Sequence, residues 1–158
     1  MSDNVMTRQG YEELKERLRR LKSVDLQQAI QEMAAAAAHG DLSENAEYDA
    51  AKEKHAFIGG RIREIDEKLA SAQVIDTSGM QSDRVVFGAT VLLEDADNGG
   101  EVTYRIVGVD EADVTAGKIS IGSPIARALI GKEEGDCVDV RTPGGVRSSA
   151  ILDISFQD

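Results

Sequence analysis

The chain has 158 residues, which is long enough for one ordinary domain or two small ones. Because 41% of its residues are hydrophobic, wholesale disorder is excluded. Its 18 basic and 29 acidic residues give a net charge of −11, which excludes a protein that grips nucleic acid without the help of a partner. The only cysteine, Cys137, excludes an internal disulfide and a multi-cysteine zinc site.

The amino terminus carries no signal for export or membrane insertion. Residues 1–6 lack a basic segment followed by an apolar run, and no stretch of about 18 apolar residues occurs in the sequence. A single cysteine also fits a reducing compartment. We therefore expect a soluble, cytoplasmic protein with no membrane partner.

Apolar residues in the first half of the chain repeat at alternating spacings of three and four. The longer series, with one polar member at His55, comprises Tyr48, Ala51, His55, Ile58, Ile62, Ile65, Leu69 and Ala72. The earlier series comprises Tyr11, Leu14, Leu18 and Leu21, and it resumes with Leu26, Ile30, Met33 and Ala37. Such a heptad seam is typical of coiled coils. The slip in phase between Leu21 and Leu26 predicts a local distortion of the first helix.

A short polar segment, residues 39–44, separates the two series. Gly40 can end the first helix in the left-handed conformation, and Asp41 with Glu44 resembles a capping box at the start of the second helix. So short a connection makes the helices antiparallel neighbours. We therefore expect residues 1–76 to form a long antiparallel α-helical coiled-coil hairpin, about 45 Å long, with an acidic tip near residues 40–48.

The second half of the chain has the pattern of a small sheet. Residues 77–83 read as a linker, and four later stretches rich in Val, Ile and Thr predict strands at 85–94, 101–109, 136–141 and 146–154. Ser123 followed by Pro124 predicts the start of one short helix. The fold class is therefore α+β, with a globular domain over residues 77–158 made of a mostly antiparallel sheet and one short helix. Cys137 is expected on a strand as a small buried side chain.

Three acidic residues, Asp41, Glu44 and Glu47, lie three residues apart at the expected tip. The simplest interpretation is that they offset the dipole of the second helix, each contributing a few tenths to about 1 kcal/mol. Two carboxylates alone make a poor magnesium site, because Mg²⁺ takes six ligands and combines one or two carboxylates with substrate oxygens and water. The pair would suffice as half of a site that a partner completes.

The tip sequence, residues 40–53, resembles the signature of the Gre family of bacterial transcript cleavage factors, and most of all its GreA branch. The resemblance continues through residues 72–76, 86–89, 104–108, 123–132 and 142–145, and so covers nearly the whole chain. It implies a carboxyl-terminal FKBP-like fold, in which a short helix lies against a curved antiparallel sheet. That expectation agrees with the pattern of strands described above.

The resemblance also implies a function. A member of this family is expected to bind the bacterial RNA polymerase core, to enter its secondary channel with the hairpin, and to stimulate endonucleolytic cleavage at the 3′ end of backtracked RNA, rescuing arrested complexes. Asp41 and Glu44 match the catalytic positions that hold Mg²⁺ jointly with the polymerase. Two metal ions about 4 Å apart can activate water and stabilise the leaving oxygen. We expect a monomer that is no enzyme itself and binds no metal when free.

Other matching positions carry expected contacts, and some positions depart from the family pattern. The resemblance assigns Lys52 to contact with the nascent RNA, and Ser123 with Pro124 to docking on the rim of the channel. Ala37 stands where relatives usually have arginine, and residues 23–51 contain no Lys or Arg. We therefore expect cleavage that is weakened or confined to short backtracks. Gly122 also departs from the Asp or Asn that relatives often carry in the docking loop.

Three alternative functions remain open at this point. A Gre-like factor could block the channel and inhibit the polymerase without stimulating cleavage, since it would share this fold. The FKBP-like half could be a prolyl isomerase, although it offers few aromatic side chains to line such a site. Finally, the hairpin could be a coiled-coil adaptor whose tip is only a turn.

Overall fold

The computed structural model describes residues 4–40 and 45–156, and it divides into two compact units. One unit is Glu12–Ser71, the hairpin unit. The other, the sheet unit, combines Met1–Tyr11 with Ala72–Asp158. The sequence analysis placed residues 1–11 with the hairpin instead. They group with the sheet unit because β1 (Val5–Thr7) pairs in parallel with β2 (Gln73–Ile75), and the amide of Gln73 donates to the carbonyl of Asn4 at 2.9 Å.

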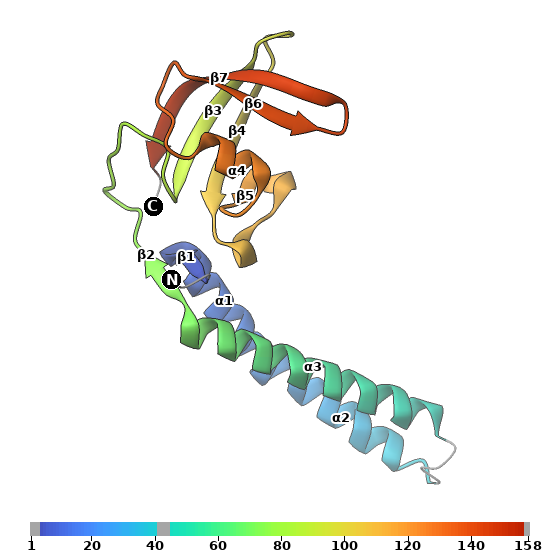
Figure 1. Cartoon of the computed structure of the whole chain (residues 1–158). Helices are drawn as coiled ribbons and strands as arrows, with labels where there is room; N and C mark the ends of the chain where they lie inside the picture. Colours follow the sequence, from blue (N-terminus) through green and yellow to red (C-terminus); the bar gives the residue numbers. More distant parts are fainter. Residues whose placement is uncertain (1–3, 41–44, 157–158) are drawn as a thin grey trace. The chain divides into compact units, whose positions relative to one another are not determined.

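The hairpin unit consists of two helical arms, as the heptad seam predicts. The first arm runs through α1 (Arg8–Arg20), the π-helical turn η1 (Leu21–Asp25) and α2 (Leu26–Ala37). The second arm is α3 (Ala46–Ser71), which lies beside α2 (Figure 1). In the described ranges, every helix is too short or too polar to span a bilayer.

The π-helical turn η1 lies where the seam slips, which confirms the predicted distortion. The amide of Leu26 donates to the carbonyl of Leu21, and the hydroxyl of Ser23 donates to the carbonyl of Arg19 at 2.8 Å. A π-turn takes in one extra residue. The apolar face of α2 therefore regains its register with the seam after the irregular spacing.

The seam between the arms is narrow and is made of small residues toward the tip. Its buried side chains are Ala29, Ala36, Ala51, Ile58 and Ile65. Small alanine side chains let two helices approach closely, and the larger buried side chains, Ile58 and Ile65, lie farther from the tip along α3. The exposed pair of Lys54 and Glu32, at 3.2 Å, bridges the arms but adds little stability because water screens it.

The sheet unit contains five strands in the order β5-β4-β3-β7-β6. Their bounds are β3 (Ala89–Asp95), β4 (Glu101–Val107), β5 (Lys118–Ser120), β6 (Cys137–Thr142) and β7 (Gly145–Phe156). Every neighbouring pair is antiparallel except β4 with β5. The short helix α4 (Pro124–Leu129) packs against the sheet, and two 3-10 turns, η3 (Val109–Glu111) and η4 (Val114–Ala116), lead into β5. The α+β fold class is thereby confirmed.

The core of the sheet unit lies between α4 and one face of the sheet. Its fully buried members include Val85, Val91, Leu93, Ile106, Ala126, Leu129 and Ile151. The prediction for Cys137 is wrong, because this side chain is exposed. Strand residues alternate between faces, and on the edge strand β6 it is the next residue, Val138, that faces the core.

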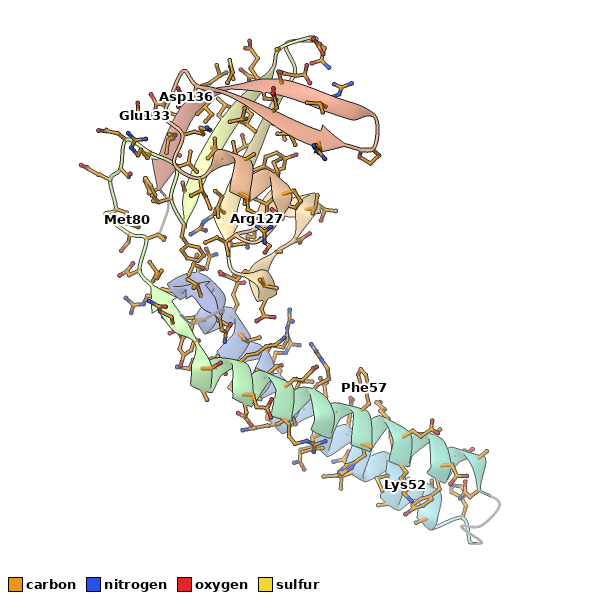
Figure 2. All side chains as sticks on the ribbon, viewed as in Figure 1. Lys52, Phe57, Met80, Arg127, Glu133 and Asp136 are labelled. Atoms are coloured by element: carbon orange, nitrogen blue, oxygen red, sulfur yellow. The ribbon has the colours of Figure 1, made fainter. Side chains whose placement is uncertain are left out.

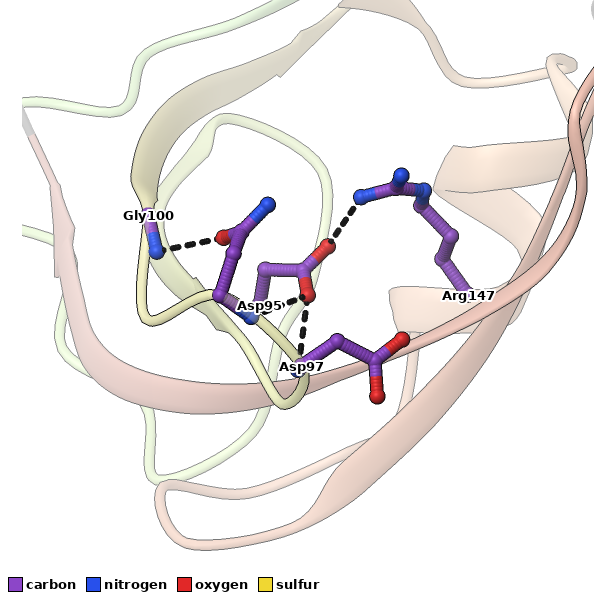
Figure 3. A network of polar contacts seen from close by, with 5 residues as sticks. Asp95, Asp97, Gly100 and Arg147 are labelled. Carbon is purple, nitrogen blue, oxygen red and sulfur yellow. Dashed lines mark hydrogen bonds and ion pairs between the residues drawn. The ribbon is translucent and has the colours of Figure 1, made fainter.

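The turn between β3 and β4 is organised by one carboxylate (Figure 3). Asp95 accepts hydrogen bonds from the backbone amides of Asp97 at 2.8 Å and Asn98 at 3.2 Å, and from the guanidinium of Arg147 on β7 at 2.9 Å. The amide of Asp97, then Arg147 and the amide of Asn98, lower the pKa of Asp95 because each stabilises its charged form. The turn is thus tied to the neighbouring hairpin β6–β7.

Candidate functional site at the hairpin tip

The two residues expected to carry the chemistry, Asp41 and Glu44, lie outside the described residues. The structure does define both ends of the segment that contains them. On the first arm, the amide of His39 donates to the carbonyl of Ala36 at 3.1 Å, and Gly40 has a positive φ of 110°. This is the left-handed end of a helix expected from Gly40.

The second arm begins differently from the sequence expectation. Asn45 is the cap of α3, because its side-chain oxygen accepts a hydrogen bond from the amide of Tyr48 at 3.0 Å. The capping box expected from Asp41 and Glu44 lies outside the described residues, and α3 itself begins after it, at Ala46. An asparagine three residues before Tyr48 was the signal in the sequence that could have located this cap.

Asn45 also ties the two arms together. Its side-chain nitrogen donates to the carbonyl of Ala36, the last buried residue of α2, at 2.7 Å. One amide side chain thus satisfies a free amide at the start of α3 and adds a second hydrogen bond to the carbonyl of Ala36, which already accepts from the amide of His39. Asn45 therefore links the end of α2 to the start of α3.

A shallow groove runs between the arms beside the tip. Four alanines, Ala35, Ala36, Ala50 and Ala51, line it together with the polar residues Glu32, His39, Glu47 and Lys54. Nowhere in residues 4–40 and 45–156 do three side chains of His, Cys, Asp or Glu come together as metal ligands. Glu47 and Asp49 lie in the first turn of α3, where their charge favours the helix dipole.

Lys52, the expected RNA contact, lies exposed on α3 close to the tip (Figure 2). Within the described part of the chain, no residue forms an ion pair with it, whereas the ammonium of the nearby Lys54 is bound to Glu32. Lys52 is therefore the basic side chain nearest the tip that remains available to a phosphate.

The expected docking residues lie in the sheet unit and not at the tip. Ser123 caps α4, since its hydroxyl accepts from the amide of Ala126 at 3.3 Å, and Pro124 takes the first helical position. Pro124, Arg127 and Ile130 are exposed around this short helix. The helix start predicted from Ser123 and Pro124 is confirmed, and its role in docking stays a prediction.

Comparison with known proteins gives matches over almost the whole chain. The family model for the amino-terminal part of transcription elongation factors matches residues 4–74, and the model for the carboxyl-terminal part of GreA/GreB matches residues 80–156. Transcription elongation factor GreA of Anaeromyxobacter sp. (strain K) is 59% identical over 151 residues, covering 96% of this chain and 91% of the relative. GreA of Alkalilimnicola ehrlichii is 54% identical over 157 residues, covering 99% of each chain. Among solved structures, GreA factor homolog 1 of Thermus thermophilus matches with a TM-score of 0.43 and 30% identity, covering 96% of this chain and 97% of that one.

Proposed function

Since this chain belongs to the GreA/GreB family of transcription elongation factors, we propose that it acts on bacterial RNA polymerase, and that it stimulates cleavage of the 3′ end of backtracked RNA from within the secondary channel. The sheet unit docks on the rim of the channel, and the hairpin reaches the active centre. The chain is not a nuclease by itself in this proposal. It supplies side chains that the polymerase lacks.

The observation that carries the proposal is the construction of the tip end of the hairpin. The buried side chains nearest the tip, Ala36 and Ala51, are alanines, so the arms form a slender pair of helices there. Asn45 clamps both arms at the base of the loop. A slender pair of helices joined by Asn45, with an acidic sequence at its end, fits a role of delivering carboxylates into a confined space.

Asp41 and Glu44 hold Mg²⁺ jointly with the polymerase in this proposal. Because Asn45 caps α3, the start of this helix does not depend on either carboxylate. Two carboxylates leave most of the six magnesium positions to the polymerase, the RNA and water. When bound, the ion lowers the pKa of an attacking water and stabilises the leaving oxygen of the phosphodiester. Lys52 lies within the first two turns of α3 and pairs with a phosphate of the displaced RNA.

A cleavage assay on a stalled, backtracked elongation complex with Mg²⁺ tests the proposal. The unaltered chain is expected to release short 3′ fragments, whereas Asp41→Asn/Glu44→Gln is expected to bind the polymerase without releasing them. The matched control is Asp49→Asn/Glu53→Gln, which removes two exposed carboxylates from α3 and is expected to behave like the unaltered chain. Equal cleavage by the tip variant and the control would refute the donated carboxylates.

One observation favours a second function, inhibition by blocking the channel. The first arm has no Lys or Arg after Lys22, so this arm offers no cation to the RNA near the tip. A factor that enters the channel without engaging RNA would slow both nucleotide addition and intrinsic cleavage. Substituting Ala37→Arg decides between weak stimulation and inhibition, because restored cleavage on longer backtracks supports the first and an unchanged block supports the second.

A further inference from the structure

A single carboxylate, that of Glu111 in η3, joins two segments that are far apart in the sequence. Its Oε2 accepts hydrogen bonds from the amide of Thr7 at 3.0 Å and from the amide of Gly108 at 2.8 Å. Its Oε1 accepts from the hydroxyl of Thr7. Hydrogen bonds to an ionised acceptor are roughly twice as strong as neutral ones. Thr7 is only 2% exposed, so water competes poorly for this contact.

Thr7, which is bound to Glu111, also binds the first turn of α1. It is the residue before α1, and its hydroxyl oxygen accepts from the amide of Gly10 at 3.1 Å, as an N-cap does. The hydroxyl therefore accepts from the helix and donates to Glu111. The negative charge also lies at the amino-terminal end of α1, where the helix dipole favours it.

Two glycines make room for the contact. A Cβ at Gly10 would lie 2.0 Å from Oε1 of Glu111, and a Cβ at Gly108 would lie 2.0 Å from the carbonyl oxygen of Val5. Neither glycine has a positive φ. Each position therefore requires glycine because a neighbouring atom approaches its Cα closely, and not because the backbone adopts a conformation that only glycine favours. We call the set Thr7, Gly10, Gly108 and Glu111 the α1 joint.

A second contact holds the same helical turn. Arg105 on β4 is 9% exposed, and its guanidinium donates to the side-chain oxygen of Gln9 at 3.1 Å and to the hydroxyl of Thr77 at 3.4 Å. The first turn of α1 is thus fixed to the rest of the sheet unit at Thr7 and at Gln9. From this turn the first arm continues through η1 and α2 without leaving helical structure until Ala37.

We propose that Glu111 is a positioning residue. By holding the first turn of α1, it allows the tip of the hairpin to reach the active centre when the sheet unit is bound to the polymerase. This proposal rests on the proposed function. A tethered group reacts at a rate set by its effective concentration at the target, which falls as the tether loosens. Loss of the α1 joint releases the first turn of α1, from which the first arm continues, from η3. Misplacement by about 1 Å can cost about a hundredfold in rate.

The test compares Glu111→Gln and Gly10→Ala with the exposed control Glu101→Gln in the cleavage assay. Glu111→Gln removes the charge with little change in volume. Gly10→Ala does not alter Glu111 itself, but its added methyl occupies the position of the Glu111 carboxylate and displaces it. Alanine also favours the helix by about 1 kcal/mol relative to glycine. Both joint variants are expected to lower the maximal cleavage rate at saturating factor by about tenfold or more. The concentration for half-maximal cleavage, and competition with labelled unaltered protein, are expected to stay within about twofold, because docking lies elsewhere.

Three results would overturn the proposal. One is an unchanged maximal rate in both variants, and another is a raised half-maximal concentration with an unchanged rate, which would assign Glu111 to docking. The third is loss of the folded sheet unit in both variants by circular dichroism, which would assign it to stability alone. Inactivity of the unaltered chain would instead refute the proposed function. Amide exchange at Thr7 and Gly10, slow in the unaltered chain and faster in Glu111→Gln, reports on the joint independently of cleavage.

Discussion

Phe57 and Ile58 are adjacent on α3, and the smaller of the two side chains, that of Ile58, is expected to contribute more to the stability of the fold. Phe57 is the larger residue but is 69% exposed and projects outward from the helix (Figure 2), whereas Ile58 is 6% exposed in the seam. Ile58→Ala removes three buried carbons at about 0.8 kcal/mol each, so about 2.4 kcal/mol is lost before any cavity term. The cavity brings the expected cost into the range of about 2 to 5 kcal/mol.

Phe57→Ala is expected to change the free energy of unfolding by no more than about 0.5 kcal/mol in either direction. The exposed ring loses little contact, and alanine has the higher helix propensity. Urea unfolding followed by far-ultraviolet circular dichroism measures both variants. With an m-value of about 2 kcal/mol per M, Ile58→Ala should lower the midpoint by about 1 M or more, and Phe57→Ala should leave it nearly unchanged. A larger loss for Phe57→Ala would refute the assignment of the seam.

Substitutions at three further residues test the sheet unit. The pKa of Asp95 is lowered in the folded protein, so its contacts stabilise the fold at pH values above the ordinary aspartate pKa of about 3.9. This stabilisation is lost as the pH falls through the lower pKa of the folded state. Asp95→Asn should abolish that part of the acid dependence of thermal unfolding, and an unchanged acid dependence would contradict the reasoning. Ser123→Ala removes the cap of α4 and should cost about 1 kcal/mol in urea unfolding, whereas Ser123→Asp should retain most of it. Gly88 has a φ of 89°, so Gly88→Ala should destabilise the unit by about 1 kcal/mol or more, and an unchanged melting temperature would show that the turn relaxes freely.

The heptad pattern was sufficient to predict the hairpin, because its seam is a local property of the sequence. The same pattern predicted the irregular turn between Leu21 and Leu26, since a slip in phase has to be absorbed somewhere in a helix that keeps one packed face. It did not identify Asn45 as the cap of α3. Asparagine is a good cap residue, but its position here depends on the contact of Asn45 with Ala36 on the other arm.

In the second half of the chain, strands that lie in long apolar stretches of sequence could be predicted, whereas strands of only three residues could not. β5 has three residues and pairs with β4 in parallel, so it has too few positions to show alternation. The α1 joint could not be predicted either, because Thr7 and Glu111 are separated by 104 positions and neither belongs to a periodic pattern. The roles of Asp41, Glu44 and Lys52 stay predictions that follow from family membership.

The parallel pairing of β1 with β2 has a consequence for how such a chain can change in evolution. Val5 lies in register with Gln73, so the hairpin begins and ends at the same place on the sheet unit. Residues added in equal numbers to both arms, one heptad at a time, would lengthen the hairpin while the paired strands and the sheet kept their connections. The length of the hairpin can therefore change without any change in the sheet unit, and hairpins of different length can be exchanged between β1 and β2.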